Sequence, residues 1–178
     1  MNEEIFDIVS EDDSRVIGQA PRSKCHGDPS LIHRAVRIHI FHPENGKLLL
    51  QKRTLSKKIQ PGKWDAAVGG HISAGESIEK ALSRELEEEL GIRLAAEELS
   101  LVPFYRIQVR NEVESENIHA FYLFHKGPFS IQEEELEKVE FFTEEELREK
   151  LEKEKDIFTP LLQEELAEHL LGSFPLPG

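Results

Sequence analysis

Residues 70–92 constrain the fold of this chain more than any other segment, because they contain a helix whose apolar stripe turns acidic. At about 100° per residue, one helix face carries three apolar residues: Ile78, Ala81 and Leu82. The same stripe continues through Glu85 and Glu89, where a core-facing helix would carry Leu or Val. Like charges held away from bulk water require either protonation or a bound cation. The pattern predicts a helix over 77–90 that packs on a core and presents carboxylates to a cation.

The ends of this helix and a third carboxylate support the same interpretation. Ser77 is a suitable N-cap, and Gly91 can adopt the left-handed conformation just past the last turn. Glu88 lies at the edge of the acidic stripe, three residues after Glu85. Oxygen ligands favour a hard cation, so Mg²⁺ or Mn²⁺ is expected. A solvated acidic surface is the alternative, and we prefer it for 144–146, where no apolar stripe overlaps the charges.

Composition and charge exclude several classes of function. The chain has 178 residues with 38% hydrophobic and 32% charged residues, which is typical of a globular domain. Its net charge of −13 argues against a nucleic-acid partner. Cys25 is the single cysteine, and the acidic start of the chain resembles neither a signal peptide nor a membrane span. These features predict a cytoplasmic protein without a membrane partner.

One basic segment runs against this acidic balance. Residues 47–64 contain six cations and no acid: Lys47, Lys52, Arg53, Lys57, Lys58 and Lys63. Any single lysine in such a loop is more simply explained as a solvated charge. Together they suit a small anionic ligand, and Arg53 and Lys63 are our candidates for contacting it.

Strand patterns dominate the middle of the chain, and helices are few. Alternating or continuous apolar runs predict strands at 33–41, 48–50, 64–71, 99–109, 118–125 and 139–142. Residues 1–30 are expected to form two short strands and a connection, and 133–138 a solvated connection. C-terminal helices are expected over 143–171, with Thr143 as an N-cap and the last helix over 157–171. No repeat or linker divides the chain, which predicts one domain over 1–178 with a mixed sheet flanked by helices.

The segment 70–92 resembles the Nudix box. That box reads Gly, five residues, Glu, seven residues, Arg-Glu, an aliphatic residue, any residue, Glu-Glu, any residue, Gly and an aliphatic residue. Every position is filled, by Gly70, Glu76, Arg84, Glu85, Leu86, Glu88, Glu89, Gly91 and Ile92. Seven fixed residue types, each at about a tenth of composition, would match by chance at roughly one in 10⁷ start positions.

The resemblance implies a fold and a set of roles. It implies the Nudix α/β/α sandwich with a mixed central sheet, and a divalent metal held by Glu85, Glu88 and Glu89. It also implies that Arg84 orients a neighbouring glutamate. Gly70 would let the backbone approach the site, where its carbonyl group can join the metal ligands.

The chemistry implied is cleavage of a diphosphate linkage in a small nucleotide-like metabolite. Metal ions neutralise charge on the phosphate oxygens and activate a water molecule. Glu85 is our first choice for both metal binding and water activation. Some family members use a glutamate from a later loop, and three candidates lie in this chain: Glu112, Glu114 and Glu116.

Over roughly residues 4–145 the chain also resembles type I isopentenyl-diphosphate isomerase and the hydrolases near it. Four segments carry this resemblance: Asp7-Ile8-Val9, His33-Arg34-Ala35, Gln51-Lys52-Arg53 and Pro61-Gly62-Lys63-Trp64-Asp65. The isomerase binds metal with three histidines and two glutamates. The resemblance therefore implies a second divalent metal site, one that would also suit zinc, made of His26, His33, His71, Glu114 and Glu116.

Two alternatives to a hydrolase remain. An isomerase needs a cysteine two residues before the position of His71, but this chain has Gly69 there and its thiol elsewhere, at Cys25. A non-catalytic, nucleotide-sensing Nudix-like module would tolerate a broken box, whereas this box is whole. The identity of the substrate stays open, as does a homodimer formed through the early strands or the last helix.

Overall fold

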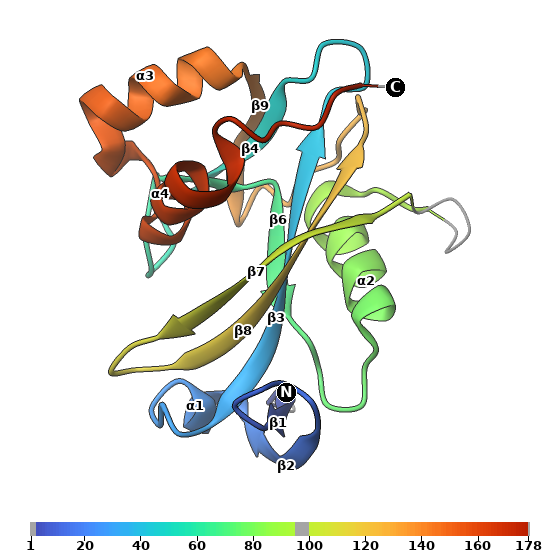
Figure 1. Ribbon diagram of the computed structural model, residues 1–178, viewed down its shortest axis with the longest axis vertical. Coiled ribbons are helices and arrows are strands. Elements are labelled where there is room, and N and C mark those ends of the chain that lie inside the picture. The colour runs from blue at the N-terminus through green and yellow to red at the C-terminus, as the bar shows by residue number, and fades with distance from the viewer. Residues whose placement is uncertain (1–2, 95–99, 178) are drawn as a thin grey trace.

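A central mixed sheet organises the computed structural model, which describes residues 3–94 and 100–177 (Figure 1). Seven strands form it: β3 (Ile32–Phe41), β4 (Leu48–Arg53), β5 (Trp64–Ala66), β6 (Val68–His71), β7 (Val102–Arg110), β8 (Ser115–Phe124) and β9 (Leu136–Phe142). A separate hairpin consists of β1 (Ile5–Val9) and β2 (Val16–Pro21). The helical segments are α1 (Arg22–Cys25), α2 (Ile78–Leu90), α3 (Glu144–Glu154), a 3₁₀ turn (Lys155–Ile157), α4 (Pro160–Glu165) and a π-helical turn (Leu166–Leu170).

Strand β3 lies at the centre of the sheet and changes its antiparallel partner along its length. It pairs with β6 from Ala35 to Ile38, and with β4 only at Ile40 and Phe41. On its other edge it runs parallel to β8 over its whole length. Because β4 and β6 diverge from a shared strand, the sheet opens between them, and side chains from both can face a common space.

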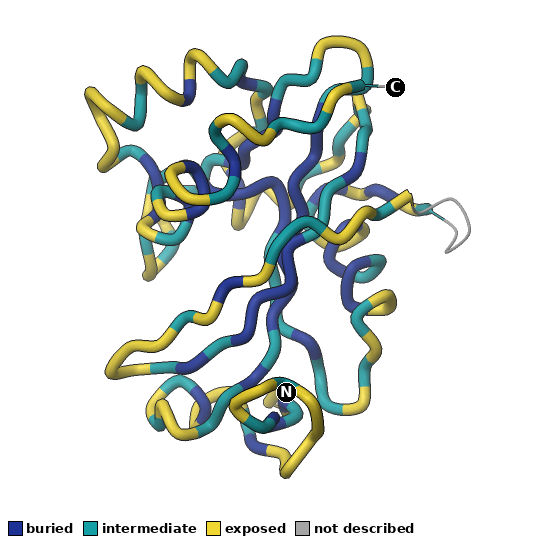
Figure 2. Tube along the Cα trace, viewed as in Figure 1, coloured by how far each residue is buried: buried dark blue, intermediate teal, exposed yellow. Residues whose placement is uncertain are grey.

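Helices cover the two sides of the sheet, as the mixed-sheet fold class predicts. α2 lies on one side, while α3 and α4 lie on the other (Figure 1). The α2 side buries a core that includes Val36 and Leu86, and the α4 side buries a second core that includes Phe41 and Leu162. Figure 2 shows the buried positions concentrated along the central strands between these helices. The predicted fold class is confirmed.

Three predicted boundaries differ from the structure. The expected solvated connection at 133–138 is partly a strand, because the buried side chain of Leu136 starts β9 opposite Arg53. The last helix does not begin at residue 157, because Thr159 caps a helix that has Pro160 in its first turn. The strand predicted from residue 99 begins at Val102, and residue 99 itself lies outside the described residues.

The N-terminal strands agree with prediction, and the hairpin packs against the sheet through a small core of its own. Phe6 and Cys25 are fully buried there, so the cysteine side chain fills space beneath the hairpin. Within the described residues, every helix is too short or too polar to cross a membrane.

The cores on the two faces give a direct test of the fold. Leu162 is fully buried on α4, so Leu162→Ala is expected to lower the free energy of unfolding by about 2–5 kcal/mol. Leu55 is 81% exposed, and Leu55→Ala is expected to change it by less than about 0.5 kcal/mol. Urea denaturation of both variants checks the difference; equal effects would contradict the packing described.

Candidate active site

Helix α2 has the ends and the orientation that its sequence predicts. The Ser77 hydroxyl accepts a hydrogen bond from the backbone N–H of Lys80, and Gly91 ends the helix at φ 66°, in the left-handed region. Glu85 is only 7% exposed and continues the buried stripe of the helix. Glu89 is partly buried, whereas Glu88 is exposed. The acidic stripe therefore turns inward at two of its three carboxylates.

Arg84 links most of the acidic residues around this helix. Its Nε and Nη2 atoms donate to the two carboxylate oxygens of Glu76, each at 2.9 Å. Its Nη1 atom donates to Glu85 Oε1 at 2.6 Å and approaches Glu88 Oε2 at 3.3 Å. Nη2 also donates to the carbonyl of His71 at 2.9 Å. Arg84 thus holds the loop after β6, the start of α2 and the Glu85 carboxylate in one arrangement.

Gly70 lies directly against the carboxylate of Glu85. A Cβ atom added to Gly70 would lie 2.0 Å from Glu85 Oε1 and 2.6 Å from Oε2, closer than two such atoms can approach. Only glycine therefore allows the β6 backbone and the α2 carboxylate to come so close. The backbone at Gly70 therefore lies directly beside the Glu85 carboxylate.

The two inward carboxylates have raised pKa values. Desolvation raises the pKa of Glu85, although the nearby Arg84 opposes it. Desolvation, together with the charge of Glu85, raises the pKa of Glu89 to about 8. Glu89 accepts a hydrogen bond from Gln51 Nε2 at 2.8 Å, but this amide carries no compensating charge. These carboxylates are placed where a cation would stabilise their ionised forms.

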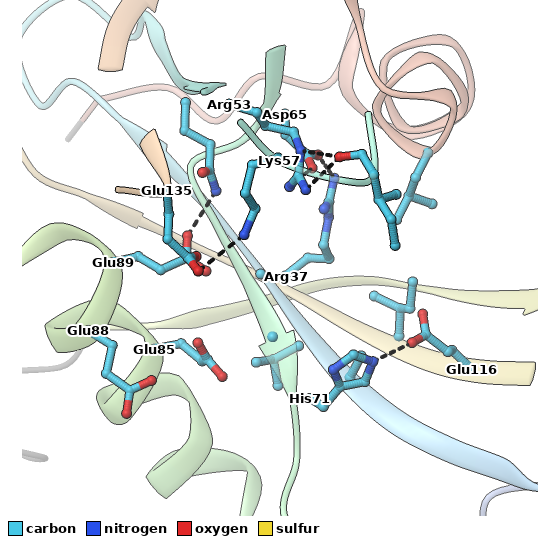
Figure 3. Close-up of a pocket in the computed structure, with 18 of the residues that line it drawn as sticks. Arg37, Arg53, Lys57, Asp65, His71, Glu85, Glu88, Glu89, Glu116 and Glu135 are labelled. Carbon is cyan, nitrogen blue, oxygen red and sulfur yellow. Dashed lines mark hydrogen bonds and ion pairs between the residues drawn. The ribbon is translucent and has the colours of Figure 1, made fainter. Parts of the chain in front are cut away.

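A cleft of about 530 Å³ joins the predicted residues. Its lining includes the α2 carboxylates (Glu85, Glu88, Glu89), a histidine–glutamate group (His26, His71, Glu114, Glu116) and several cations, among them Arg53 and Lys57 of the basic segment. In the view of Figure 3 the α2 carboxylates lie on one side of β6, and the His71–Glu116 pair lies on the other. Two sets of residues far apart in sequence therefore face one space.

The structure brings together four of the five residues predicted for a second metal site. The ligating atoms of His26, His33, His71 and Glu116 lie within 4.8 Å of one another. His71 Nε2 is 2.7 Å from Glu116 Oε1, and His33 Nε2 is 3.3 Å from the same oxygen. Glu114, the fifth residue, approaches His26 Nε2 at 3.7 Å. His33, His71 and Glu116 come from β3, β6 and β8, and His26 follows the last residue of α1; they converge where β3 pairs with both β6 and β8.

The nitrogen atoms of this cluster are available as ligands. His33 Nδ1 lies 3.2 Å from the carbonyl of Leu31, which assigns the ring proton to Nδ1 and leaves a lone pair on Nε2. Within the described residues, buried Nε2 atoms of His26 and His33 have no hydrogen-bond partner. Burial raises the pKa of Glu116, but the close approach of His33 and His71 to its carboxylate outweighs burial and holds that pKa far below its usual range. The cluster thus places two unpartnered ring nitrogens beside an ionised carboxylate.

The other predicted residues are placed less uniformly. Arg53 lines the cleft, and its Nε and Nη2 atoms donate to the carbonyl of Ile59, which fixes the guanidinium beside the cavity. Lys63 is not among the described residues that line the cleft; Lys57 lines it and pairs with Glu135 at 3.1 Å. Glu112 is exposed and is likewise absent from the described cleft lining, unlike Glu114 and Glu116.

Sequence reasoning missed a buried ion-pair network beside the cleft. Arg37 on β3 pairs with Asp65 at 2.7 Å and with Glu165 of α4 at 2.5 Å. Tyr105 donates its hydroxyl to Glu165 at 3.1 Å. One indication was present in the sequence: Arg37 falls on the same strand face as His33 and His39, opposite the apolar face of that strand.

Comparison with known proteins identifies the family. The sequence model of the NUDIX domain matches residues 31–162. This range includes the whole Nudix box and the later glutamates Glu112, Glu114 and Glu116. The chain belongs to the Nudix family.

The relatives agree with this assignment. The chain is 34% identical over 169 residues to Nudix hydrolase 3 of Arabidopsis thaliana, covering 90% of this chain but 22% of that protein. It is 37% identical over 161 residues to the uncharacterized Nudix hydrolase YfcD of Escherichia coli strain K12, covering 88% of this chain and 81% of that protein. The crystal structure of DR0079 from Deinococcus radiodurans is 25% identical, with a TM-score of 0.74 over 93% of this chain and 99% of that one.

The raised pKa of Glu89 makes metal-free stability depend on pH. Its pKa is about 8 in the folded protein and 4.5 when unperturbed, so only the folded form retains the proton between these values. Its contribution to stability is therefore complete below about pH 4.5 and is lost as the pH rises through about 8. We therefore compare the native chain with Glu89→Gln in the presence of a chelator. The difference between their free energies of unfolding is expected to shift against the native chain as the pH rises from about 4.5 to about 8. Urea denaturation at several pH values checks this; a constant difference would contradict it.

Proposed function

We propose that this chain is a divalent-metal-dependent hydrolase that cleaves a diphosphate linkage in a small nucleotide-like metabolite. The observation that carries the proposal is the inward acidic stripe of α2, with Glu85 pressed against Gly70 and held by Arg84. Such a desolvated carboxylate group is suited to a hard cation, with Mg²⁺ or Mn²⁺ as the expected ion. Glu85, Glu88 and Glu89 would hold it, with the backbone carbonyl of Gly70, which lies beside Glu85, as a further ligand.

The residues of the cleft divide the remaining tasks. A bound divalent ion would neutralise phosphate charge and lower the pKa of a bound water molecule. Glu85 is our first choice for accepting the proton of that water, because its raised pKa brings it closer to neutral pH. Arg53 and Lys57 line the same cleft and supply positive charge for the substrate phosphates. Lys63 is a weaker candidate for this role, because the cleft lining among described residues does not include it.

The hydrolase proposal is favoured over an isomerase by what surrounds Gly69. A Cβ atom on this residue would lie 3.3 Å from both Cδ and Nη1 of Arg37. The guanidinium thus borders the space where the isomerase carries its cysteine. A fixed cation at that point suits an anionic oxygen better than a carbon–carbon double bond. Incubating the protein with isopentenyl diphosphate and following isomerisation and phosphate release tests the two activities together.

The metal assignment is tested by matched glutamate variants of α2. Glu88→Gln and Glu89→Gln are each expected to abolish turnover of diphosphate compounds with Mg²⁺ while the protein stays folded. Glu87→Gln is the control, because Glu87 on the same helix is exposed and pairs with Arg93 at 2.8 Å, outside the cleft. The measurement is phosphate release from a panel of nucleotide sugars, dinucleoside polyphosphates, nucleoside triphosphates and prenyl diphosphates. Full activity in either cleft variant would contradict the assignment, and a wild type inactive on every compound would favour a non-catalytic sensing module.

We also propose a second divalent metal at the histidine cluster, with Glu114 as an additional ligand. Three nitrogen donors and a carboxylate suit zinc or manganese, and their ligating atoms are already gathered. Phe6 stacks on His33 and His71, with ring centroids 5.1 and 4.7 Å apart, which limits the movement of both rings.

Counting bound metal tests this second site independently of activity. Titration with Mn²⁺ is expected to give two equivalents for the native chain and one for His26→Gln, whose partly exposed side chain can be changed without opening a core. His125→Gln, a histidine outside the cluster, is the control and should keep two. Unchanged stoichiometry in His26→Gln would remove the cluster from the metal sites.

A further inference from the structure

Arg37 carries a charge in the middle of the central strand, which requires compensation. Its Nε atom donates to Glu165 Oε1 at 3.1 Å, and Nη2 donates to Glu165 Oε2 at 2.5 Å and to Asp65 Oδ1 at 2.7 Å. The Arg37 side chain is 9% exposed and that of Glu165 is fully buried. Burial lowers the pKa of Arg37, but the two carboxylates outweigh it and keep the group charged.

These contacts use only part of the guanidinium. Arginine has five N–H donors in a planar fork, and the bonds to Asp65 and Glu165 engage Nε and Nη2. Within the described residues, Nη1 donates no hydrogen bond. Because it is also not one of the buried polar atoms that lack a partner, Nη1 is accessible rather than enclosed. Arg37 also lines the cleft. The unused edge of the fork therefore faces the cavity.

The backbone next to Arg37 makes room for this edge. Arg37 is the register partner of Gly69 across β3 and β6, and its Nη1 and Cδ atoms lie where a side chain at Gly69 would begin. The neighbouring Gly70 makes room in the same manner for the Glu85 carboxylate. Because successive residues of a strand point to opposite faces, the two glycines admit a cation on one face of β6 and an anion on the other, and both groups line the cleft.

We propose that Arg37 is a substrate-binding residue whose Nη1 group donates hydrogen bonds to a phosphate oxygen, with Asp65 and Glu165 as positioning residues. This inference rests on the proposed function, because it assigns a donor to the diphosphate of the same substrate. It links a residue of the C-terminal helix α4 to substrate binding through one guanidinium.

The charge of the surroundings supports this role. Carboxylates outnumber lysine and arginine in the cleft lining, so an anionic substrate meets net repulsion unless metal and cations are close together. Asp65 is shared: Arg53 Nη1 lies 3.8 Å from its Oδ2 atom, while Arg37 holds Oδ1. Thr159 also donates to Asp65 Oδ1 at 3.1 Å. The two arginines are therefore fixed relative to each other through one carboxylate.

If Arg37 only balanced the buried charges of Asp65 and Glu165, its Nη1 group would not need to be accessible from the cleft. A lysine between Asp65 and Glu165 would satisfy both charges, but its ammonium group has no planar fork to extend past them. Arg37→Lys therefore separates the two roles: it retains the buried charge balance and removes the Nη1 donors.

Binding of a non-hydrolysable probe tests the proposal. With saturating Mg²⁺, calorimetry is expected to show methylenediphosphonate binding to Arg37→Lys about ten- to a hundredfold more weakly than to the native chain, as for loss of a charged hydrogen bond. Affinity for Mn²⁺ alone should change less than about twofold. Arg34→Lys is the matched control, because Arg34 lies on the same strand, pairs with Asp13 and is not among the described residues lining the cleft. It should bind the probe as the native chain does.

A second variant keeps the test decisive if Arg37→Lys does not fold. Gly69→Ala retains the guanidinium and its charge but places a Cβ atom 3.3 Å from Nη1, so the probe should bind several-fold more weakly. Native probe affinity in a folded Arg37→Lys or Gly69→Ala protein would overturn the proposal, as would no binding by the native chain. Measuring hydrolysis of diphosphate compounds distinguishes the proposed hydrolase function from the proposed role of Arg37 in binding. Arg37-dependent binding without hydrolysis of any diphosphate would reject only the proposed function, and hydrolysis with unchanged binding in Arg37→Lys would reject only the role of Arg37.

Discussion

The contact between the Glu85 carboxylate and the backbone of Gly70 is the constraint on which the rest of the site depends. A carboxylate taken out of water is costly unless charge or hydrogen bonds compensate it. Arg84 supplies one compensating charge and ties it to Glu76 and to the carbonyl of His71. The loop between β6 and α2 is therefore held by the same guanidinium that holds the acid, so the loop and the acid cannot move independently.

Strand β3 brings the remaining charged groups to this point. One of its faces carries Val36, Ile38 and Ile40 into the core under α2. The other face carries His33 and Arg37, each within reach of carboxylates from other elements. Because side chains alternate along β3, the strand supplies the packing that supports α2 on one face and charged groups of the cleft on the other.

The sequence predicted what depends on short-range patterns. The cap at Ser77, the left-handed Gly91 and the inward turn of the acidic stripe all follow from residues within one helix. The histidine cluster required the resemblance, because its members come from four separate segments of the chain. The pair Arg37–Glu165 joins residues 128 positions apart, and no local pattern indicates which buried acid meets which buried base. For the basic segment 47–64, the sequence predicted an anion site but not which lysine would line it. The conformation of the loop decides this, and it places Lys57 rather than Lys63 at the cleft.

The acidic residues in and beside the cleft differ in which groups compensate their charge, and this difference indicates where a cation is needed. Glu76 has Arg84, Glu116 has two histidines, and Asp65 has Arg37. Glu89 has the neutral amide of Gln51 and the neutral backbone N–H of Gly69 beside it, and neither group cancels its charge. Its pKa is raised while that of Glu116 is lowered, although both are shielded from solvent. A protein that needed only rigidity there would pair Glu89 as it pairs the others. An acid left without a counter-charge, beside Glu85 and facing open space, is therefore best explained by a partner that the chain does not encode.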